Sequence, residues 1–168
     1  MGDRDAEFTT YVAQRRPQLY RLACLLCGDP HRAEDIVQTA LAKLYVAWEK
    51  ASRLEGLDAY TRRIVVNSHL DDTRRPWRRE RPREVEDLDG PARAPLAVEE
   101  TDALWTALRS LPVGQRRVVV LRHYWGLSVE EVAADLGIST GTVKSQSSLA
   151  IHHLRRVLDP VASRGERA

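Results

Sequence analysis

The segment from Leu127 to Leu154 constrains the fold of this chain most, because it reads as two short helices joined by a tight turn. Ser128 can cap the first helix, and Glu131, three residues later, completes a capping box. Gly137 can end that helix in a left-handed conformation, and Ser139 can cap the second helix. Small and apolar residues at helical spacing form the inward faces, namely Val132, Ala133, Leu136, Val143, Ser147, Ala150, Ile151 and Leu154. The segment therefore predicts a helix-turn-helix unit.

The outer face of the second predicted helix carries short polar side chains and one cation. These residues are Thr140, Thr142, Lys144, Ser145 and Ser148. Such groups can reach base edges and phosphates when a helix enters a DNA groove. The alternative interpretation is an ordinary amphipathic hairpin inside a core. We favour a DNA-binding helix.

The composition indicates a soluble globular protein. The length of 168 residues suits one domain or two small ones. Of these residues, 43% are hydrophobic and 30% are charged. The formal net charge is only +2, so only the distribution of charge can indicate a nucleic-acid partner. No apolar run approaches 18 residues, and the N-terminal segment lacks the apolar stretch of a signal peptide. We expect a cytoplasmic protein that makes no membrane contact.

Helical periodicity extends over almost the whole chain, and no segment alternates like a strand. The first helical run covers about Asp5 to Cys27, with an interruption expected near Pro17. After Pro30 comes the clearest apolar stripe in the chain: Ala33, Ile36, Val37, Ala40, Leu41, Leu44 and Trp48. We expect Trp48 to lie in the core. A further helix, capped by Asp58, should run to about Arg75, and another should cover Gln115 to Trp125.

Charge divides the chain into two parts. Eight arginines and Trp77 lie between Arg62 and Arg83, a composition that suits phosphate contact and base stacking, although a solubilising helix end is an equal alternative. From Glu84 to Glu100 the chain becomes acidic and rich in small residues and proline. We therefore predict an all-α fold with two small helical domains, residues 5–78 and 101–158, joined by a flexible acidic linker over residues 79–100.

The residues give no indication of catalysis. Cys24 and Cys27 form a C-x-x-C pair, but they lie in an apolar helical run without a second ligand pair, so we interpret them as small buried hydrophobes. No nucleophile elbow, phosphate-binding loop or pair of carboxylates in an apolar cleft is recognisable. We expect no enzyme activity, no metal, no cofactor and no small-molecule ligand.

The order of motifs resembles the sigma-70 family of bacterial sigma factors, and within it the extracytoplasmic-function group and its actinobacterial SigE-like subgroup. The first set of motifs is AEDIVQTAL at 33–41, Trp48, AYTRRIVVN at 59–67 and DDTRR at 71–75. The second set is Leu111-Pro112, QRRVVVLRHY at 115–124 and the helix-turn-helix segment. The resemblance covers about residues 8–158. It implies a promoter-specificity subunit of RNA polymerase, with sigma region 2 in the first domain and region 4 in the second.

The resemblance also implies partners and site residues. The acidic face of Glu34, Asp35 and Gln38 would dock on the clamp helices of the largest polymerase subunit, and the flap of the second-largest subunit would be a further contact. The −10 promoter element would be bound by Arg62, Arg63, Asn67, Arg74 and Arg75, and the loop at 51–57 would hold one flipped base. The −35 element would be read by Ser139, Thr140, Thr142, Lys144, Ser145, Gln146 and Ser148, with phosphate contacts from Arg155 and Arg156. Whether an anti-sigma factor exists is left open by the sequence.

One departure from the family and two rival functions bear on this hypothesis. Leu149 stands where the family often has arginine, which should weaken phosphate anchoring by the recognition helix. A stand-alone helix-turn-helix regulator of duplex operators is the first rival, and the combination of an acidic docking face with a separate basic helix argues against it. The second is a protein adaptor whose hairpin contacts a protein; charge reversal at Lys144 and Arg155 would leave its transcriptional effect intact.

Overall fold

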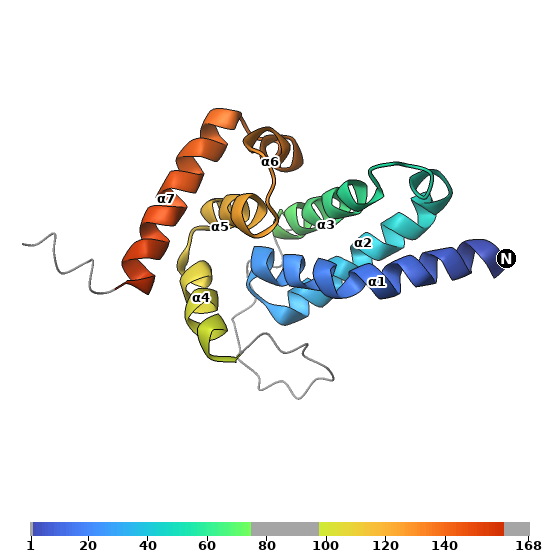
Figure 1. The fold of residues 1–168 in the computed structure, drawn as a ribbon, viewed down its shortest axis with the longest axis horizontal. Coiled ribbons are helices and arrows are strands. Elements are labelled where there is room, and N and C mark those ends of the chain that lie inside the picture. Colours follow the sequence, from blue (N-terminus) through green and yellow to red (C-terminus); the bar gives the residue numbers. More distant parts are fainter. Residues whose placement is uncertain (1, 75–97, 160–168) are drawn as a thin grey trace, which may run out of the picture.

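The structure, a computed structural model, describes residues 2–74 and 98–159, and all regular elements in these ranges are helical (Figure 1). The first range holds three helices: α1 (Gly2–Cys27), α2 (Pro30–Ala51) and α3 (Leu57–Thr73). The second holds five: α4 (Val98–Ser110), α5 (Val113–Val119), η2 (Val120–Tyr124), α6 (Val129–Leu136) and α7 (Thr140–Leu158). The predicted all-α fold is confirmed. Most of the predicted linker lies outside the described residues, and its last three residues fall within α4.

Helix α2 forms as its sequence predicts. The Asp29 carboxylate accepts a hydrogen bond from the backbone N–H of His31 at 2.9 Å, and Pro30 occupies the first turn. Six of the seven residues in its predicted stripe are buried, and the seventh, Leu41, is half-buried. Trp48 is 3% exposed and packs edge-on against Phe8, which confirms its place in the core.

Two local predictions were wrong. Helix α1 continues through Pro17 without a break. Both Pro17 and Ala13, whose carbonyl loses its helical partner, are exposed, so water can satisfy that carbonyl. Asp58 does not cap α3: the N-cap is Gly56, and the Asp58 carboxylate reaches across to α1 instead.

The predicted helix over 115–125 is α-helical only at its start. It widens into a π turn over η2, and the backbone N–H of Trp125 donates to the carbonyl of Val120 at 3.0 Å. The wider turn still buries Val120 and Leu121.

The helix-turn-helix is confirmed in detail. The hydroxyl of Ser128 accepts from the backbone of Glu131 at 3.1 Å, and the Glu131 carboxylate accepts from the backbone of Ser128 at 2.8 Å. Gly137 has a φ of 66°, which the short turn into α7 requires. Val132 and Val143 are fully buried between the two helices.

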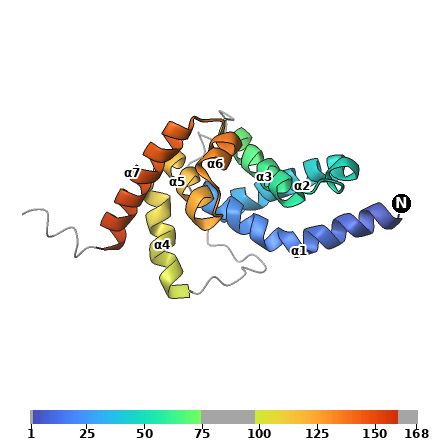
Figure 2. The same ribbon diagram turned by 45° about the horizontal axis from the view of Figure 1, so that its top comes forward.

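The two halves of the described chain share one hydrophobic core. Helices α5 and α6 lie against α1 and α3, as both views of the ribbon show (Figures 1 and 2). Leu22 and Leu26 from the first half join a single apolar cluster with Val118 and Leu121 from the second. The potential DNA-binding elements of both halves are therefore held in one compact arrangement.

Candidate nucleic-acid interface

The outer face of α7 is open to solvent. Of the residues predicted on it, only Gln146 is half-buried; the exposed ones are Ser139, Thr140, Thr142, Lys144, Ser145, Ser148, Arg155 and Arg156. Leu149, 53% exposed, lies on the same face. An exposed helix face of short polar groups, backed by a well-packed partner helix, suits entry into a major groove.

Hydrogen bonds fix the first turn of α7. The hydroxyl of Ser139 accepts from the backbone N–H of Thr142 at 3.1 Å and lies 2.9 Å from the Thr142 hydroxyl. The hydroxyl of Ser145 donates to the carbonyl of Thr142 at 3.1 Å. The polar groups at the start of α7 are thus held in place before any ligand arrives.

The face of α3 that carries the predicted DNA-binding residues differs from the face of α7. Arg63, Asn67 and Arg74 are exposed, but Arg62 retains only 6% of its surface. Arg75, also predicted to bind DNA, lies outside the described residues.

The group that covers Arg62 is the carboxylate of Asp135, on α6. Arg62 Nε donates to Asp135 Oδ2 at 2.9 Å, and Arg63 Nε donates to Asp135 Oδ1 at 3.0 Å. The Asp135 side chain is fully buried. Sequence reasoning missed this residue, although its spacing from Val132 and Leu136 places it beside the apolar face of α6.

A second set of polar contacts joins the same two halves. Arg117 on α5 donates to His69 Nε2 at 2.9 Å and to the Thr73 hydroxyl at 3.0 Å, both on α3. Arg116 donates to the carbonyl of Leu26 at 3.1 Å. Burial, with the positive charges of Arg117, Arg32 and Arg116, lowers the pKa of His69 to about 3, so this imidazole is neutral in the folded chain.

The acidic face of α2 lies beside α1. Glu34 is half-buried, forms an ion pair with Arg16 and accepts a hydrogen bond from the Gln38 amide at 3.3 Å. Asp35 and Gln38 are exposed on the same helix. The structure therefore groups the three predicted docking residues on one side of α2.

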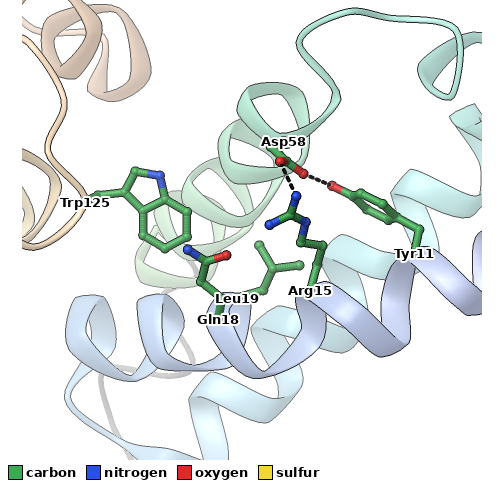
Figure 3. Close-up of a pocket in the computed structure, with 6 residues that line it drawn as sticks. All are labelled: Tyr11, Arg15, Gln18, Leu19, Asp58 and Trp125. Carbon is green, nitrogen blue, oxygen red and sulfur yellow. Dashed lines mark hydrogen bonds and ion pairs between the residues drawn. The ribbon is translucent and has the colours of Figure 1, made fainter.

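A small pocket of about 170 Å³ lies where the two halves meet (Figure 3). Its lining residues are Tyr11, Arg15, Gln18, Leu19, Asp58 and Trp125. Arg15 pairs with Asp58 at 2.7 Å, and the Tyr11 hydroxyl donates to the same carboxylate at 2.9 Å. Burial is the main reason why the pKa of Tyr11 is raised to about 12. Three of the polar side chains at the pocket, those of Tyr11, Arg15 and Asp58, are thus engaged with one another.

Neither cysteine is in a disulfide. Cys27 is buried in the core and Cys24 is half-buried; burial raises the pKa of Cys27 to about 12 and that of Cys24 to about 11, which disfavours the reactive thiolate. Within residues 2–74 and 98–159 no cluster of three His, Cys, Asp or Glu side chains could hold a metal ion. In the same ranges no helix has the length and apolar character needed to cross a membrane.

Comparison with known proteins gives consistent matches to both halves. The family model Sigma-70 region 2 matches residues 11–79, and Sigma-70, region 4 matches residues 101–154. The RNA polymerase sigma-E factor of Streptomyces coelicolor is 41% identical over 157 residues, covering 90% of this chain and 86% of that protein. The ECF RNA polymerase sigma factor SigM of Mycobacterium tuberculosis is 34% identical, covering 94% and 79%.

Two solved structures resemble the whole arrangement. The sigma factor RpoE of Bartonella quintana, in complex with the anti-sigma factor NepR, has a TM-score of 0.70 at 27% identity, covering 90% of this chain and 96% of that one. CnrH, in complex with the cytosolic domain of CnrY, has a TM-score of 0.62 at 25% identity, covering 95% and 92%.

Proposed function

This chain belongs to the extracytoplasmic-function group of the sigma-70 family, the RNA polymerase sigma factors that direct transcription initiation, and on that premise we propose which of its surfaces bind polymerase and promoter. A sigma factor binds core RNA polymerase and performs no bond chemistry of its own. We assign region 2 to residues 5–78, the linker to 79–100 and region 4 to 101–158.

Region 4 reads duplex −35 DNA through α7. The observation that carries this assignment is the exposed polar face of α7 on a capped helix-turn-helix, with Lys144 at its centre and two arginines in its last turn. Short hydroxyl groups near the N-terminus of α7 can approach base edges, while Lys144, Arg155 and Arg156 contact phosphates. Leu149 adds an apolar contact surface but no phosphate contact, so affinity depends more heavily on the remaining cations.

Region 2 binds the −10 element through α3. Arg62, Arg63 and Asn67 on α3, with Arg74 at its C-cap and Arg75 next in the sequence, supply cations and one amide, and the loop before α3 holds a flipped base. The exposure of Arg63, Asn67 and Arg74 supports the assignment. Arg62 contributes only after its pairing with Asp135 is released.

The acidic side of α2 docks on the polymerase clamp helices. Glu34, Asp35 and Gln38 present carboxylates and an amide from adjacent turns, a pattern that suits a basic partner surface. The flap of the second-largest subunit is the further polymerase contact. The protein acts in the cytoplasm, together with polymerase and DNA. One of the two similar structures is a sigma factor in complex with an anti-sigma factor, which supports an anti-sigma factor for this chain as well.

The experiment is run-off transcription with purified core polymerase and genomic promoter fragments, with and without this protein. We expect discrete new transcripts that disappear with Asp35→Arg, because the reversed charge repels the clamp. The same reversal at the exposed Asp3, at the start of α1, is the matched control and should leave transcripts intact. Absence of transcripts, together with tight duplex binding by the protein alone, would contradict the proposal.

A further inference from the structure

We propose that the free chain inhibits itself: Asp135 of the helix-turn-helix occupies the DNA-binding guanidinium groups of region 2, and α6 must leave α3 before the −10 element can bind. The inference rests on the proposed role of Arg62 and Arg63 in DNA binding. It adds an intramolecular competitor that lies in the other DNA-binding domain.

The contact between Asp135 and Arg62 excludes a DNA phosphate from the Arg62 guanidinium. The Arg62 side chain is 7% exposed and the Asp135 side chain is 0% exposed, so a DNA phosphate cannot reach this guanidinium while α6 is in place. Arg63 is less restricted, because 56% of its side chain remains exposed although its Nε is already bonded to Asp135. Closure therefore removes one cation from the surface of α3 and engages part of a second.

The chemistry of the contact imitates phosphate binding. An arginine guanidinium pairs with a carboxylate through the same directed N–H groups that it uses for a phosphate. Asp135 supplies one negative charge to two cations, whereas a nucleic-acid strand supplies a phosphate to each and gains affinity from released counterions. DNA is thus a stronger competitor once α6 has moved away.

Part of the boundary between the halves is polar, beside the apolar cluster that they share. Arg116 and Arg117 of α5 bind a backbone carbonyl, a hydroxyl and a neutral imidazole of the first half, beside the shared apolar cluster. Buried ionic and polar contacts add little net stability, because desolvation offsets much of their attraction. These polar contacts therefore contribute little to holding the closed arrangement against a competing partner.

The test uses the full chain and two readouts. Small-angle X-ray scattering gives the radius of gyration, and fluorescence anisotropy gives the affinity for labelled single-stranded oligonucleotides of random sequence. Asp135→Ala should raise the radius of gyration and tighten DNA binding by about tenfold, since apparent affinity scales with the fraction of open chain. Arg117→Gln loosens the same boundary from another helix and should shift both readouts in the same direction. Glu130→Ala, which removes an exposed carboxylate of α6, is the matched control and should change neither.

The outcomes separate self-inhibition from a purely structural role and from the proposed function. If Asp135→Ala lowers stability without tightening DNA binding, Asp135 is only a structural partner and the inference is wrong. If both Asp135→Ala and Arg117→Gln expand the chain but DNA binding stays unchanged, the inference is again wrong. Run-off transcription with Arg62→Ala then shows which proposal has failed. If transcripts are lost, the −10 assignment stands and only self-inhibition is rejected. If transcripts are unchanged, the −10 assignment is rejected as well.

Discussion

The two helices that we propose to face DNA differ in how exposed their predicted DNA-binding side chains are. The face of α7 is exposed and its polar groups are fixed by hydrogen bonds within its own first turn. The corresponding face of α3 carries a guanidinium that is buried against a carboxylate 73 residues away in the sequence. A recognition helix stabilised by its own caps can face solvent, whereas the two adjacent arginines of α3 share an internal counter-ion from α6. The predictions below test this contrast, beginning with the largest effect.

A substitution in the core that both halves share should have the largest effect on the free energy of unfolding. Leu22→Ala removes a fully buried side chain from the cluster that joins both halves, and we expect it to lower the free energy of unfolding by about 2–5 kcal/mol. Urea denaturation followed by circular dichroism measures this change. Leu149→Ala, at a 53% exposed position on α7, is the matched control and should change stability by less than about 0.5 kcal/mol. Comparable losses in both variants would mean that the core is not shared as described.

Low pH should lower the free energy of unfolding through His69, which is buried on α3. The pKa of His69 is about 3 in the folded chain and about 6.5 when unfolded, so the unfolded chain binds the extra proton as pH falls. The stabilising contribution is complete above pH 6.5 and should decrease by about 1.4 kcal/mol between pH 7.5 and 5.5. Urea denaturation at both pH values tests this. His69→Gln should lack the loss, and His152→Gln, at an exposed histidine of α7, should retain it; equal pH dependence in the two variants would exclude His69 as the cause.

Loss of a helix cap in the helix-turn-helix, which contains α7, should lower the free energy of unfolding. Ser128→Ala removes one half of the capping box of α6, and we expect a loss of about 1 kcal/mol in the free energy of unfolding. Ser148→Ala, on the exposed face of α7, should have a smaller effect by the same measurement. If the two substitutions cost the same, local capping does not hold the helix-turn-helix in the way described.

The smallest effect concerns a single phosphate contact. Lys144→Ala should reduce the salt dependence of duplex binding by about one counterion, so that the affinity lost between 50 and 200 mM salt becomes about threefold smaller. Fluorescence anisotropy with a duplex promoter fragment measures the slope. Lys50→Ala removes a similar exposed cation at the end of α2 and should leave the slope unchanged. A slope that responds to Lys50 instead would place duplex binding on the first half of the chain.

Local chemistry explains which parts of this fold the sequence could predict. The helix-turn-helix was predictable because its signals lie within a few residues of one another: Ser128 with Glu131, Gly137 in the turn, and Ser139 at the next cap. The stripe of α2 was predictable because its period matches the helix over about four turns, from Ala33 to Trp48. Asp58 was misjudged as a cap because its ion pair with a distant helix is not visible in local sequence.

The candidate site was predictable in its residues but not in its arrangement. The sequence indicated a cluster of arginines that begins on α3 and a polar face on α7, yet no periodicity could show that Asp135 and Arg62 meet. Such contacts depend on how two helical units pack. The one signal of this contact in the sequence is that Asp135 is a charged residue beside the apolar face of α6. The neutral His69 beneath Arg117 was missed for the same reason.

The most direct test of the account measures the distance between the two halves with and without polymerase. Spin labels at the exposed positions 49 and 152, in a chain with Cys24 and Cys27 replaced by alanine, report this distance by double electron–electron resonance. We predict one narrow distribution for the free chain and a clear shift of its mean distance when core polymerase is added. A broad distribution in the free chain, or one that polymerase leaves unchanged, would contradict the closed arrangement in which Asp135 covers Arg62.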